Sequence, residues 1–147
     1  MTYYAVIDTN VIVSSMLKTN SIPSLIVDYI KTNTIIPLLS EEIINEYIEV
    51  LTRNKFNLDH DEVLETISII KEKGIVLKRE QTLEDFIDED DIVFYEIVLS
   101  ARTTMDAYLV TGNMKHYPIR SYIVTPREML EIINKDNQTI IENSSSS

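Results

Sequence analysis

The sequence contains no cysteine, and that absence excludes several kinds of site. Without thiols the chain forms no disulfide, offers no thiolate to a metal and carries no cysteine nucleophile. No apolar run approaches the roughly 20 residues that span a bilayer. The first residues, Met1-Thr2-Tyr3-Tyr4, lack the basic segment that opens a secretory signal. We therefore expect a cytoplasmic protein with no part in a membrane.

Positive charge is scarce as well. The chain has 13 Lys and Arg against 24 Asp and Glu, which gives a net charge of −11. Proteins that hold nucleic acid by its phosphates usually present a basic surface. Three interpretations stay open at this point. Nucleic acid is not the ligand, divalent cations supply part of the missing positive charge, or a basic protein is the partner.

The chain has enough apolar residues for one domain, since 44% of its 147 residues are hydrophobic. Apolar, β-prone runs occur at 3–7, 34–38, 75–77, 107–111 and 122–124. Helical patterns occur between them at 11–17, 24–31, 40–51, 60–73 and 90–101, and again from 125. Strands that alternate with helices predict an α/β fold with a mostly parallel, doubly wound sheet. The periodic pattern ends near Asp136, so we expect a domain over 1–135 and a disordered tail over 136–147.

Ligands of such sheets bind outside the carboxyl ends of the strands, where the strand order reverses. The residues that leave those ends are Asp8-Thr9-Asn10 after the first strand, Leu39-Ser40 after the second and Thr111-Gly112-Asn113 after the fourth. Asp8 directly follows five apolar or aromatic residues. Its carboxylate is therefore expected at the rim of the sheet, with little neighbouring charge to neutralise it.

Two further carboxylates can reach the same rim from helices. Glu46 lies at the edge of an apolar helix face beside Tyr47, and Asp91 lies in the first turn of another helix. Gathering them with Asp8 would be costly without a cation, because like charges repel at short range. Ligation by oxygen alone suits Mg²⁺ or Mn²⁺ rather than zinc. Such ions are the usual agents of phosphodiester hydrolysis.

Each of these carboxylates also has a purely structural interpretation. Asp8 can cap the helix that follows it. Glu46 can be one more solvated glutamate, since its helix also carries Glu41, Glu42 and Glu49. The acidic run Asp88 to Asp91 favours a helix N-terminus whether or not it binds anything. Taken one at a time, the residues do not choose between these alternatives.

Taken in order, the motifs resemble those of the PIN-domain superfamily over about Tyr3 to Ile133. They are Val6-Ile7-Asp8-Thr9-Asn10, Leu39-Ser40 with Glu46-Tyr47 and Val50-Leu51, Asp88-Glu89-Asp90-Asp91 with Phe94 and Glu96, the stretch from Ala107 to Pro118, and Val124-Thr125-Pro126-Arg127-Glu128. The resemblance is greatest to the branch known as toxin components of toxin–antitoxin systems, the VapC-like ribonucleases. It implies a three-layer PIN-like fold and an endoribonuclease that depends on Mg²⁺ or Mn²⁺.

The resemblance also implies roles for individual residues. Asp8, Glu46 and Asp91 match the first three acidic positions of the family. Asp91 is chosen over its neighbours Asp88 and Asp90 because it stands three residues before Phe94, as the Asp-x-x-Phe pattern requires. The supporting positions implied around these carboxylates are Thr9, Asn10, Thr111, Glu96, Asp88 and Asp90.

One position departs from the pattern. Many PIN domains have a fourth acidic residue where this chain has Asn113, so we expect a site completed by an amide and a weaker hold on metal. Glu96 is a candidate to compensate, although it lies about 140° around an ideal helix from Asp91. Lys115 and His116 could contact a phosphate, or they could form a basic loop tip with no ligand.

The sequence thus predicts an RNA-cleaving toxin that an antitoxin protein restrains and that can form a homodimer. The alternative is a catalytically silent PIN-like protein that serves as an interaction module, for which Asn113 and the acidic composition argue. A phosphatase of the haloacid-dehalogenase type also begins with an aspartate after its first strand. That class needs Asp-x-Asp there, and Asn10 occupies the second position.

Overall fold

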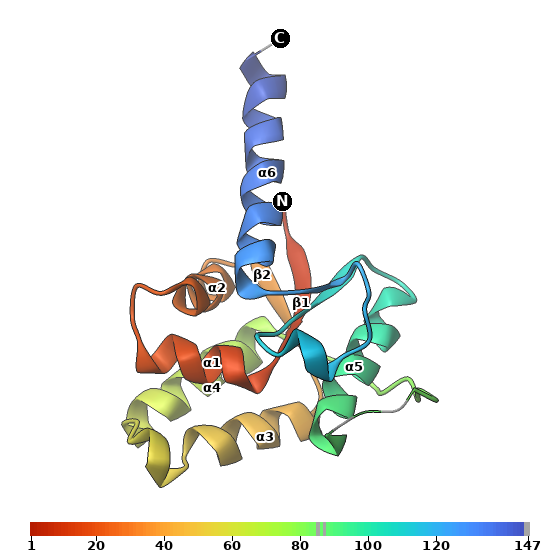
Figure 1. Ribbon diagram of the computed structural model, residues 1–147. Helices are drawn as coiled ribbons and strands as arrows, with labels where there is room; N and C mark the ends of the chain where they lie inside the picture. Colours follow the sequence, from red (N-terminus) through yellow and green to blue (C-terminus); the bar gives the residue numbers. More distant parts are fainter. Residues whose placement is uncertain (85, 87, 146–147) are drawn as a thin grey trace.

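The computed structural model describes residues 1–84, 86 and 88–145, with 139–145 as backbone only. At its centre is a five-stranded sheet in the order β3-β2-β1-β4-β5 (Figure 1). The strands are β1 (Tyr3–Ile7), β2 (Ile35–Leu39), β3 (Ile75–Val76), β4 (Ala107–Val110) and β5 (Ile123–Val124). Every neighbouring pair is parallel, as the sequence predicts. The order runs outward from β1 in both directions, so the strand order reverses between β1 and β4.

Helices cover both faces of this sheet. They are α1 (Thr9–Leu17), α2 (Ile22–Lys31), α3 (Glu41–Leu51), α4 (His60–Lys73), α5 (Glu89–Arg102) and α6 (Pro126–Ser145), with short 3₁₀ turns η1 (Asn54–Phe56) and η2 (Met114–His116). α2 and α4 pack on β2, whereas α5 packs on β1, β2 and β4 from the other side (Figure 1). The result is the expected three-layer α/β architecture.

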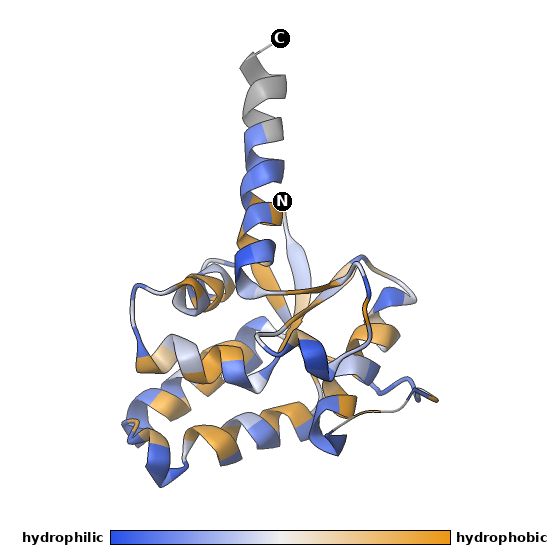
Figure 2. Cartoon of the chain, in the orientation of Figure 1, coloured by the Kyte–Doolittle hydropathy of each residue, from blue (hydrophilic) through white to orange (hydrophobic). Residues whose placement is uncertain are grey.

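The core forms because the central strands are apolar on both faces. Ala5, Val6 and Ile7 of β1 are at most 1% exposed, which is the pattern of a parallel strand covered by helices on each side. Along the helices, apolar and polar stretches alternate, as amphipathic helices on a sheet require (Figure 2). None of the helices in the described residues is long and apolar enough to cross a bilayer.

The last helix extends beyond the expected end of the domain. α6 begins in a capping box, in which Thr125 and Glu128 each bond the other's backbone N–H. It continues to Ser145, whereas the sequence predicts a disordered tail over 136–147. No glycine or proline after Pro126 interrupts it, and Tyr3 donates to the Asp136 carboxylate at 2.6 Å. The backbone therefore shows no break at 136, and the last two residues of the expected tail lie outside the described residues.

Candidate active site

Asp8 lies at the carboxyl end of β1 with 3% of its surface exposed. Its backbone N–H donates to the Val110 carbonyl of β4 at 2.9 Å, so the chain leaves β1 still paired with its neighbour. Oδ1 accepts the backbone N–H of Asn10 at 3.3 Å and so caps α1. The capping role expected from the sequence is present, but it engages only one carboxylate oxygen.

The other oxygen of Asp8 lies between two hydroxyl groups. Oδ2 accepts from Thr111 Oγ1 at 2.8 Å and from the Tyr117 hydroxyl at 3.2 Å. Thr111 directly follows β4 and is fully buried, and its Oγ1 accepts the backbone N–H of Asn113 at 3.0 Å. Because β1 and β4 are adjacent where the strand order reverses, their ends meet at this point. Asp8 therefore has neutral hydrogen-bond donors and no cationic partner among the bonds that the structure describes.

Glu46 reaches the same place from α3. The hydroxyl of its neighbour Tyr47 donates to the Ile7 carbonyl at 2.5 Å, which fastens this part of α3 to the end of β1. Thr9 Oγ1 then donates to Glu46 Oε2. Glu46 is half-buried, whereas Glu49, one turn further along, is exposed. The interpretation of Glu46 as an ordinary solvated glutamate is therefore wrong.

Asp91 comes from the first turn of α5, which Asp88 caps by accepting the backbone N–H of Asp90 at 2.9 Å. The Asp91 side chain is 13% exposed, and its Oδ2 lies 3.0 Å from His116 Nδ1. Its Oδ1 lies 3.5 Å from the Tyr117 hydroxyl. That hydroxyl is therefore within reach of both Asp8 and Asp91.

These side chains line one cleft. Its acidic members are Asp8, Glu46, Asp88, Asp90 and Asp91, and its other polar members include Thr9, Asn10, Asn113 and His116. The lining also includes Arg53, Lys55 and Phe56, which we call the cleft lip. The lip follows α3 and spans η1. The lining of the cleft thus combines many carboxylates with one short basic and aromatic segment.

The electrostatics of the cleft follow from burial and crowding. Burial is the main cause that raises the pKa of Glu46; the Thr9 hydrogen bond opposes it, and Asp8, Asp90 and Asp91 add to it. Burial and then Asp8 raise the pKa of Asp91, against a lowering by His116. The ionised forms of Glu46 and Asp91 are therefore less favoured here than they would be in water.

Tyr117 has the opposite role in this charge balance. Burial, followed by the charges of Asp8 and Asp91, raises the pKa of its hydroxyl far above the ordinary value. The hydroxyl therefore keeps its proton and acts as a donor to the carboxylates. Tyr117 lies within the stretch from Ala107 to Pro118 that carries the family resemblance, but nothing in the sequence gives it a role, because it stands in a loop 109 residues from Asp8. The cleft lip was also missed, although a basic and aromatic group in so acidic a chain could have pointed to it.

The donor set suits a hard divalent cation. Within the described residues, no three acidic or histidine side chains already converge closely enough to ligate one ion. Each site carboxylate is engaged elsewhere: Glu46 by Thr9, Asp91 by His116, and Asp8 by hydroxyl groups. The donors nevertheless include several carboxylate oxygens and no sulfur, the set that Mg²⁺ and Mn²⁺ prefer. A cation would also relieve the repulsion that contributes to the raised pKa values of Glu46 and Asp91.

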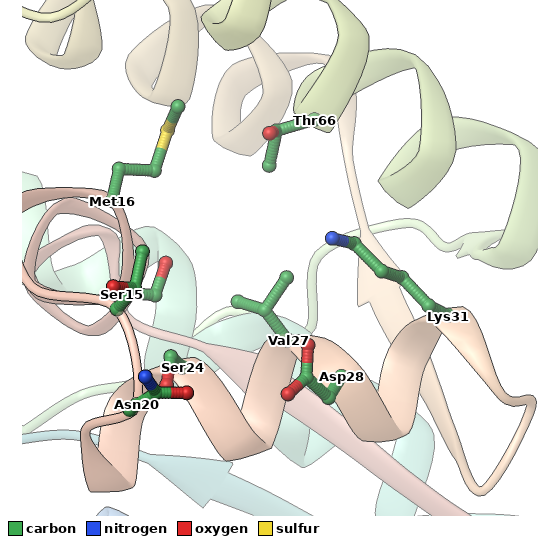
Figure 3. Close-up of a pocket in the computed structure, with 9 residues that line it drawn as sticks. Ser15, Met16, Asn20, Ser24, Val27, Asp28, Lys31 and Thr66 are labelled. Carbon is green, nitrogen blue, oxygen red and sulfur yellow. The ribbon is translucent and has the colours of Figure 1, made fainter.

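The remaining predicted residues are distributed unevenly. Asn113 and His116 line the cleft, whereas Lys115 lines a separate shallow hollow with both of them. A further cavity lies between α1, α2 and α4, where Met16, Lys31 and Thr66 face a common space (Figure 3). It shares no residue with the cleft and has a single carboxylate, Asp28, in its lining. The chemistry-bearing residues therefore gather in the cleft.

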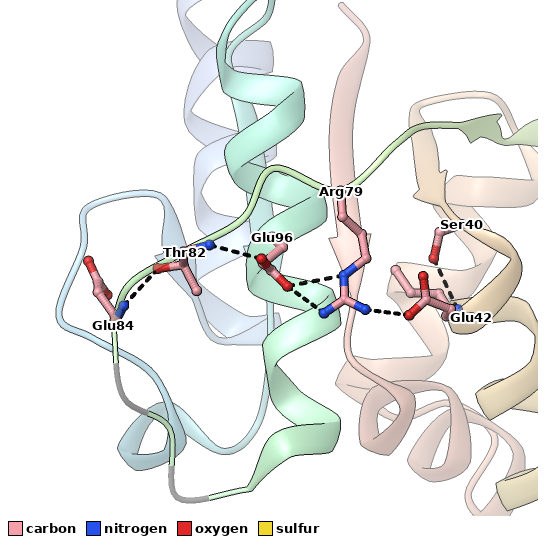
Figure 4. Close-up of polar contacts among 7 residues, drawn as sticks. Ser40, Glu42, Arg79, Thr82, Glu84 and Glu96 are labelled. Atoms are coloured by element: carbon pink, nitrogen blue, oxygen red, sulfur yellow. Dashed lines mark hydrogen bonds and ion pairs between the residues drawn. The ribbon is translucent and has the colours of Figure 1, made fainter.

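Glu96 is a correction to the expected site. It does not line the cleft; its carboxylate accepts from Arg79 Nε at 3.0 Å and from the backbone N–H of Thr82 at 2.9 Å (Figure 4). Arg79 also donates to Glu42 at 2.5 Å. The physical reason is the helical rotation between Asp91 and Glu96, which places Glu96 on another side of α5. Glu96 therefore does not compensate for Asn113.

Comparison with known families agrees with this geometry. The family model of the PIN domain matches residues 4–115. That range contains helices α1 to α5, strands β2 to β4 and nearly all of β1, together with Asp8, Glu46, Asp91 and Asn113. No curated protein matches the chain. PIN domains are generally metal-dependent nucleases that act on nucleic acid. With a match over most of its length and an acidic cleft where its strand order reverses, the chain belongs to the PIN-domain family.

Proposed function

We propose that this chain is a ribonuclease that hydrolyses phosphodiester bonds in RNA with the help of Mg²⁺ or Mn²⁺. One observation carries the proposal. Carboxylates from three separate elements, β1, α3 and α5, meet in one cleft, and burial and mutual repulsion raise the pKa values of two of them. A fold that only needed stability would pair or expose these groups. Their arrangement suits a site that is completed by a cation.

Asp8, Glu46 and Asp91 are the proposed ligands, with the Asn113 side chain as a further oxygen donor. A bound divalent cation lowers the pKa of a water molecule and stabilises charge on the leaving oxygen. Thr9, Thr111 and Tyr117 orient the carboxylates through their hydroxyl groups. Asn10 contributes its backbone N–H to Asp8, and Asp88 and Asp90 add negative charge at the cleft edge.

The cleft lip is the proposed contact for RNA. Lys55 lies over the Phe56 ring, with its ammonium nitrogen 5.0 Å from the ring centre, and both line the cleft with Arg53. Cationic groups suit phosphates and an aromatic face suits a base of a single strand. His116, which also lines the cleft, is a further proposed phosphate contact, whereas Lys115 lines only the neighbouring hollow.

Asn113 shapes the proposed metal stoichiometry. An amide oxygen can ligate a cation but brings no negative charge. We therefore expect one tightly held ion, with a second ion binding only when substrate phosphate is present.

The biological role that we propose is that of a toxin in a toxin–antitoxin pair in the cytoplasm, with an antitoxin protein as partner and homodimerisation as a further possibility. The net charge of −11 supports a partner that offers a basic segment. The useful observation here is whether a neighbouring open reading frame encodes a small protein that copurifies with this one and suppresses its activity.

The test of the enzymatic proposal is cleavage of a labelled single-stranded RNA by the purified chain with Mn²⁺, Mg²⁺ or a chelator. We expect cleavage that requires metal, that Asp8→Asn abolishes and that Asp28→Asn leaves unchanged. Asp28 is the matched control because it is exposed and lies in the separate cavity. Cleavage that persists in Asp8→Asn would point to another site or a contaminant.

The alternative is a silent PIN-fold protein that acts as an interaction module. The amide at Asn113 and the absence of a pre-formed ligand group among the described residues favour it. Calorimetric titration with Mn²⁺ separates the two. Failure to bind metal both with and without an oligonucleotide would favour the module.

A further inference from the structure

An ion pair with one buried partner, Arg79–Glu96, lies outside the lining of the cleft. Glu96 of α5 is only 4% exposed and accepts from both Nε and Nη2 of Arg79 and from the backbone of Thr82. Arg79 precedes α5 in the long connection after β3, and the backbone N–H of the next residue, Glu80, donates to the Glu96 carbonyl at 3.3 Å. The connection is therefore fastened to α5 by both side chain and backbone.

The same arginine reaches a second helix. Its Nη1 donates to Glu42 Oε2 of α3 at 2.5 Å, so one planar guanidinium bridges α3 and α5 (Figure 4). Glu42 stands four residues before Glu46, one helical turn away on the same side of α3. Arg79, Glu42 and Glu46 also line one small hollow together with Asp90. The bridge thus lies directly behind two of the acidic residues of the cleft.

The position of the bridge matters because α3 and α5 carry Glu46 and Asp91. Glu46 and Asp91 line the same cleft, so their carboxylates repel each other when both are ionised. An attraction on each helix, between Arg79 and the carboxylates of Glu42 and Glu96, opposes that repulsion. A cation binds more weakly when its ligand side chains must first be brought together. Holding these helices in place therefore favours cation binding.

We infer that Arg79 is a positioning residue of the metal site: by bridging Glu42 of α3 and Glu96 of α5, it holds Glu46 and Asp91 at the separation that a shared divalent cation needs. The inference rests on the proposed metal-dependent function. Lysine cannot replace this arginine, because a single ammonium lacks the planar fork that serves two carboxylates in different directions.

The test is calorimetric titration of the full chain with Mn²⁺, with Arg79→Lys compared against Arg120→Lys. Both substitutions keep the charge, and both arginine side chains are 39% exposed and bonded to a glutamate. Arg120 pairs with Glu84 and does not line the cleft, whereas Arg79 bonds a glutamate of α3 and one of α5. We expect the Kd for Mn²⁺ to rise about tenfold in Arg79→Lys, as for other residues that orient ligands, and less than about twofold in Arg120→Lys. Raising Mn²⁺ by the same factor should restore RNA cleavage in Arg79→Lys.

The remaining outcomes are decisive as well. An unchanged Kd in Arg79→Lys, or an equal rise in Arg120→Lys, would overturn the inference while leaving the proposed function in place. Failure of the wild-type chain to bind Mn²⁺ would overturn both. If Arg79→Lys does not fold, Glu42→Ala against Glu49→Ala decides instead, since each removes one exposed carboxylate about one turn from Glu46. Equal Kd values for Mn²⁺ in Glu42→Ala and Glu49→Ala would contradict the positioning role of Arg79.

Discussion

Two buried carboxylates in this molecule have opposite surroundings. Asp8 and Glu96 are 3% and 4% exposed, so both have lost most of their water. Glu96 is neutralised by the Arg79 guanidinium. Asp8 has only the hydroxyl groups of Thr111 and Tyr117 as side-chain donors, and it raises the pKa values of Glu46 and Asp91 through its charge.

The difference shows how a buried carboxylate with a structural role can be distinguished from one with a functional role in this fold. A buried charge is costly, and a fold that needs it only for packing supplies a counter-charge, as it does for Glu96. The cleft does not supply one for Asp8. On the proposed function, a bound cation would compensate its negative charge. We therefore expect changes at the two positions to have different consequences, in activity for one and in stability for the other.

The largest effect is expected for Asp8→Asn. Asparagine keeps the size and can still accept the Asn10 N–H, but it removes the charge on which cation binding depends. RNA cleavage should fall by well over 100-fold, since even outer partners of metal ligands cost about 10–100-fold. Thermal unfolding without metal should show no loss of stability. A variant that unfolds several degrees earlier would make Asp8 a structural residue and erase the contrast with Glu96.

Arg79→Met tests the second carboxylate of the comparison, Glu96, by removing its ion-pair partner. It leaves the Glu96 carboxylate buried without its cation, which costs about 3 kcal/mol of unfolding free energy in a partly exposed pair. Arg53→Met is the matched control, because Arg53 pairs with an exposed glutamate and its loss should destabilise the fold far less. Denaturant unfolding measures both. Equal stabilities of the two variants would contradict the structural role of the Glu96 pair.

Tyr117→Phe sharpens the account of Asp8 itself. The substitution removes the hydroxyl that lies 3.2 Å from Asp8 and 3.5 Å from Asp91 and keeps the ring in place. We expect the Mn²⁺ affinity to fall about tenfold, because the carboxylates lose a shared orienting donor. Tyr108→Phe serves as the control, since Tyr108 lines a different hollow, beside Asp136. If Tyr117→Phe and Tyr108→Phe bind Mn²⁺ with equal affinity, Tyr117 does not contribute to the metal site.

The smallest effect is expected for Glu46→Gln in the absence of metal. The folded-state pKa of Glu46 is raised, mainly by burial, so its ionisation weakens the fold as pH rises from about 4 through that raised value. Removing the charge should stabilise the metal-free protein by about 1 kcal/mol at neutral pH, and saturating Mn²⁺ should reverse the order of the two melting temperatures. Glu49→Gln, an exposed neighbour, should change neither value. If Glu46→Gln is less stable than the wild type without metal, the unfavourable ionisation that we assign to Glu46 in the cleft is contradicted.

Much of this fold follows from local sequence. The apolar run before Asp8 predicts β1, and parallel strands bring their carboxyl ends to one edge, so the meeting of Asp8 with Thr111 could be expected. The helical pattern in the sequence begins at residue 24, after Pro23, whereas α2 begins at Ile22. Pro23 lies in the first turn of α2, after a capping box at Ser21, where a proline without an N–H is tolerated.

What the sequence could not predict are contacts between distant segments without a periodic pattern. Arg79 lies in a polar connection and Tyr117 in a loop, and neither pattern specifies a partner. Glu46 was expected mainly from family resemblance, because spacing alone does not distinguish it from the exposed Glu49. Glu96 did carry a signal: it interrupts a helix that buries Tyr95 and Ile97 on either side of it, and a buried glutamate needs a cation.

The central claim is that Asp8 has no cationic partner among the described residues because the cleft binds a cation. Its most direct test is calorimetric titration of the metal-free chain with Mn²⁺ at neutral pH, beside Asp8→Asn and Asp28→Asn. We predict saturable binding in the wild type, the same binding in Asp28→Asn and none in Asp8→Asn. Binding of equal strength in Asp8→Asn, or no binding in the wild type with or without an RNA oligonucleotide, would contradict the account.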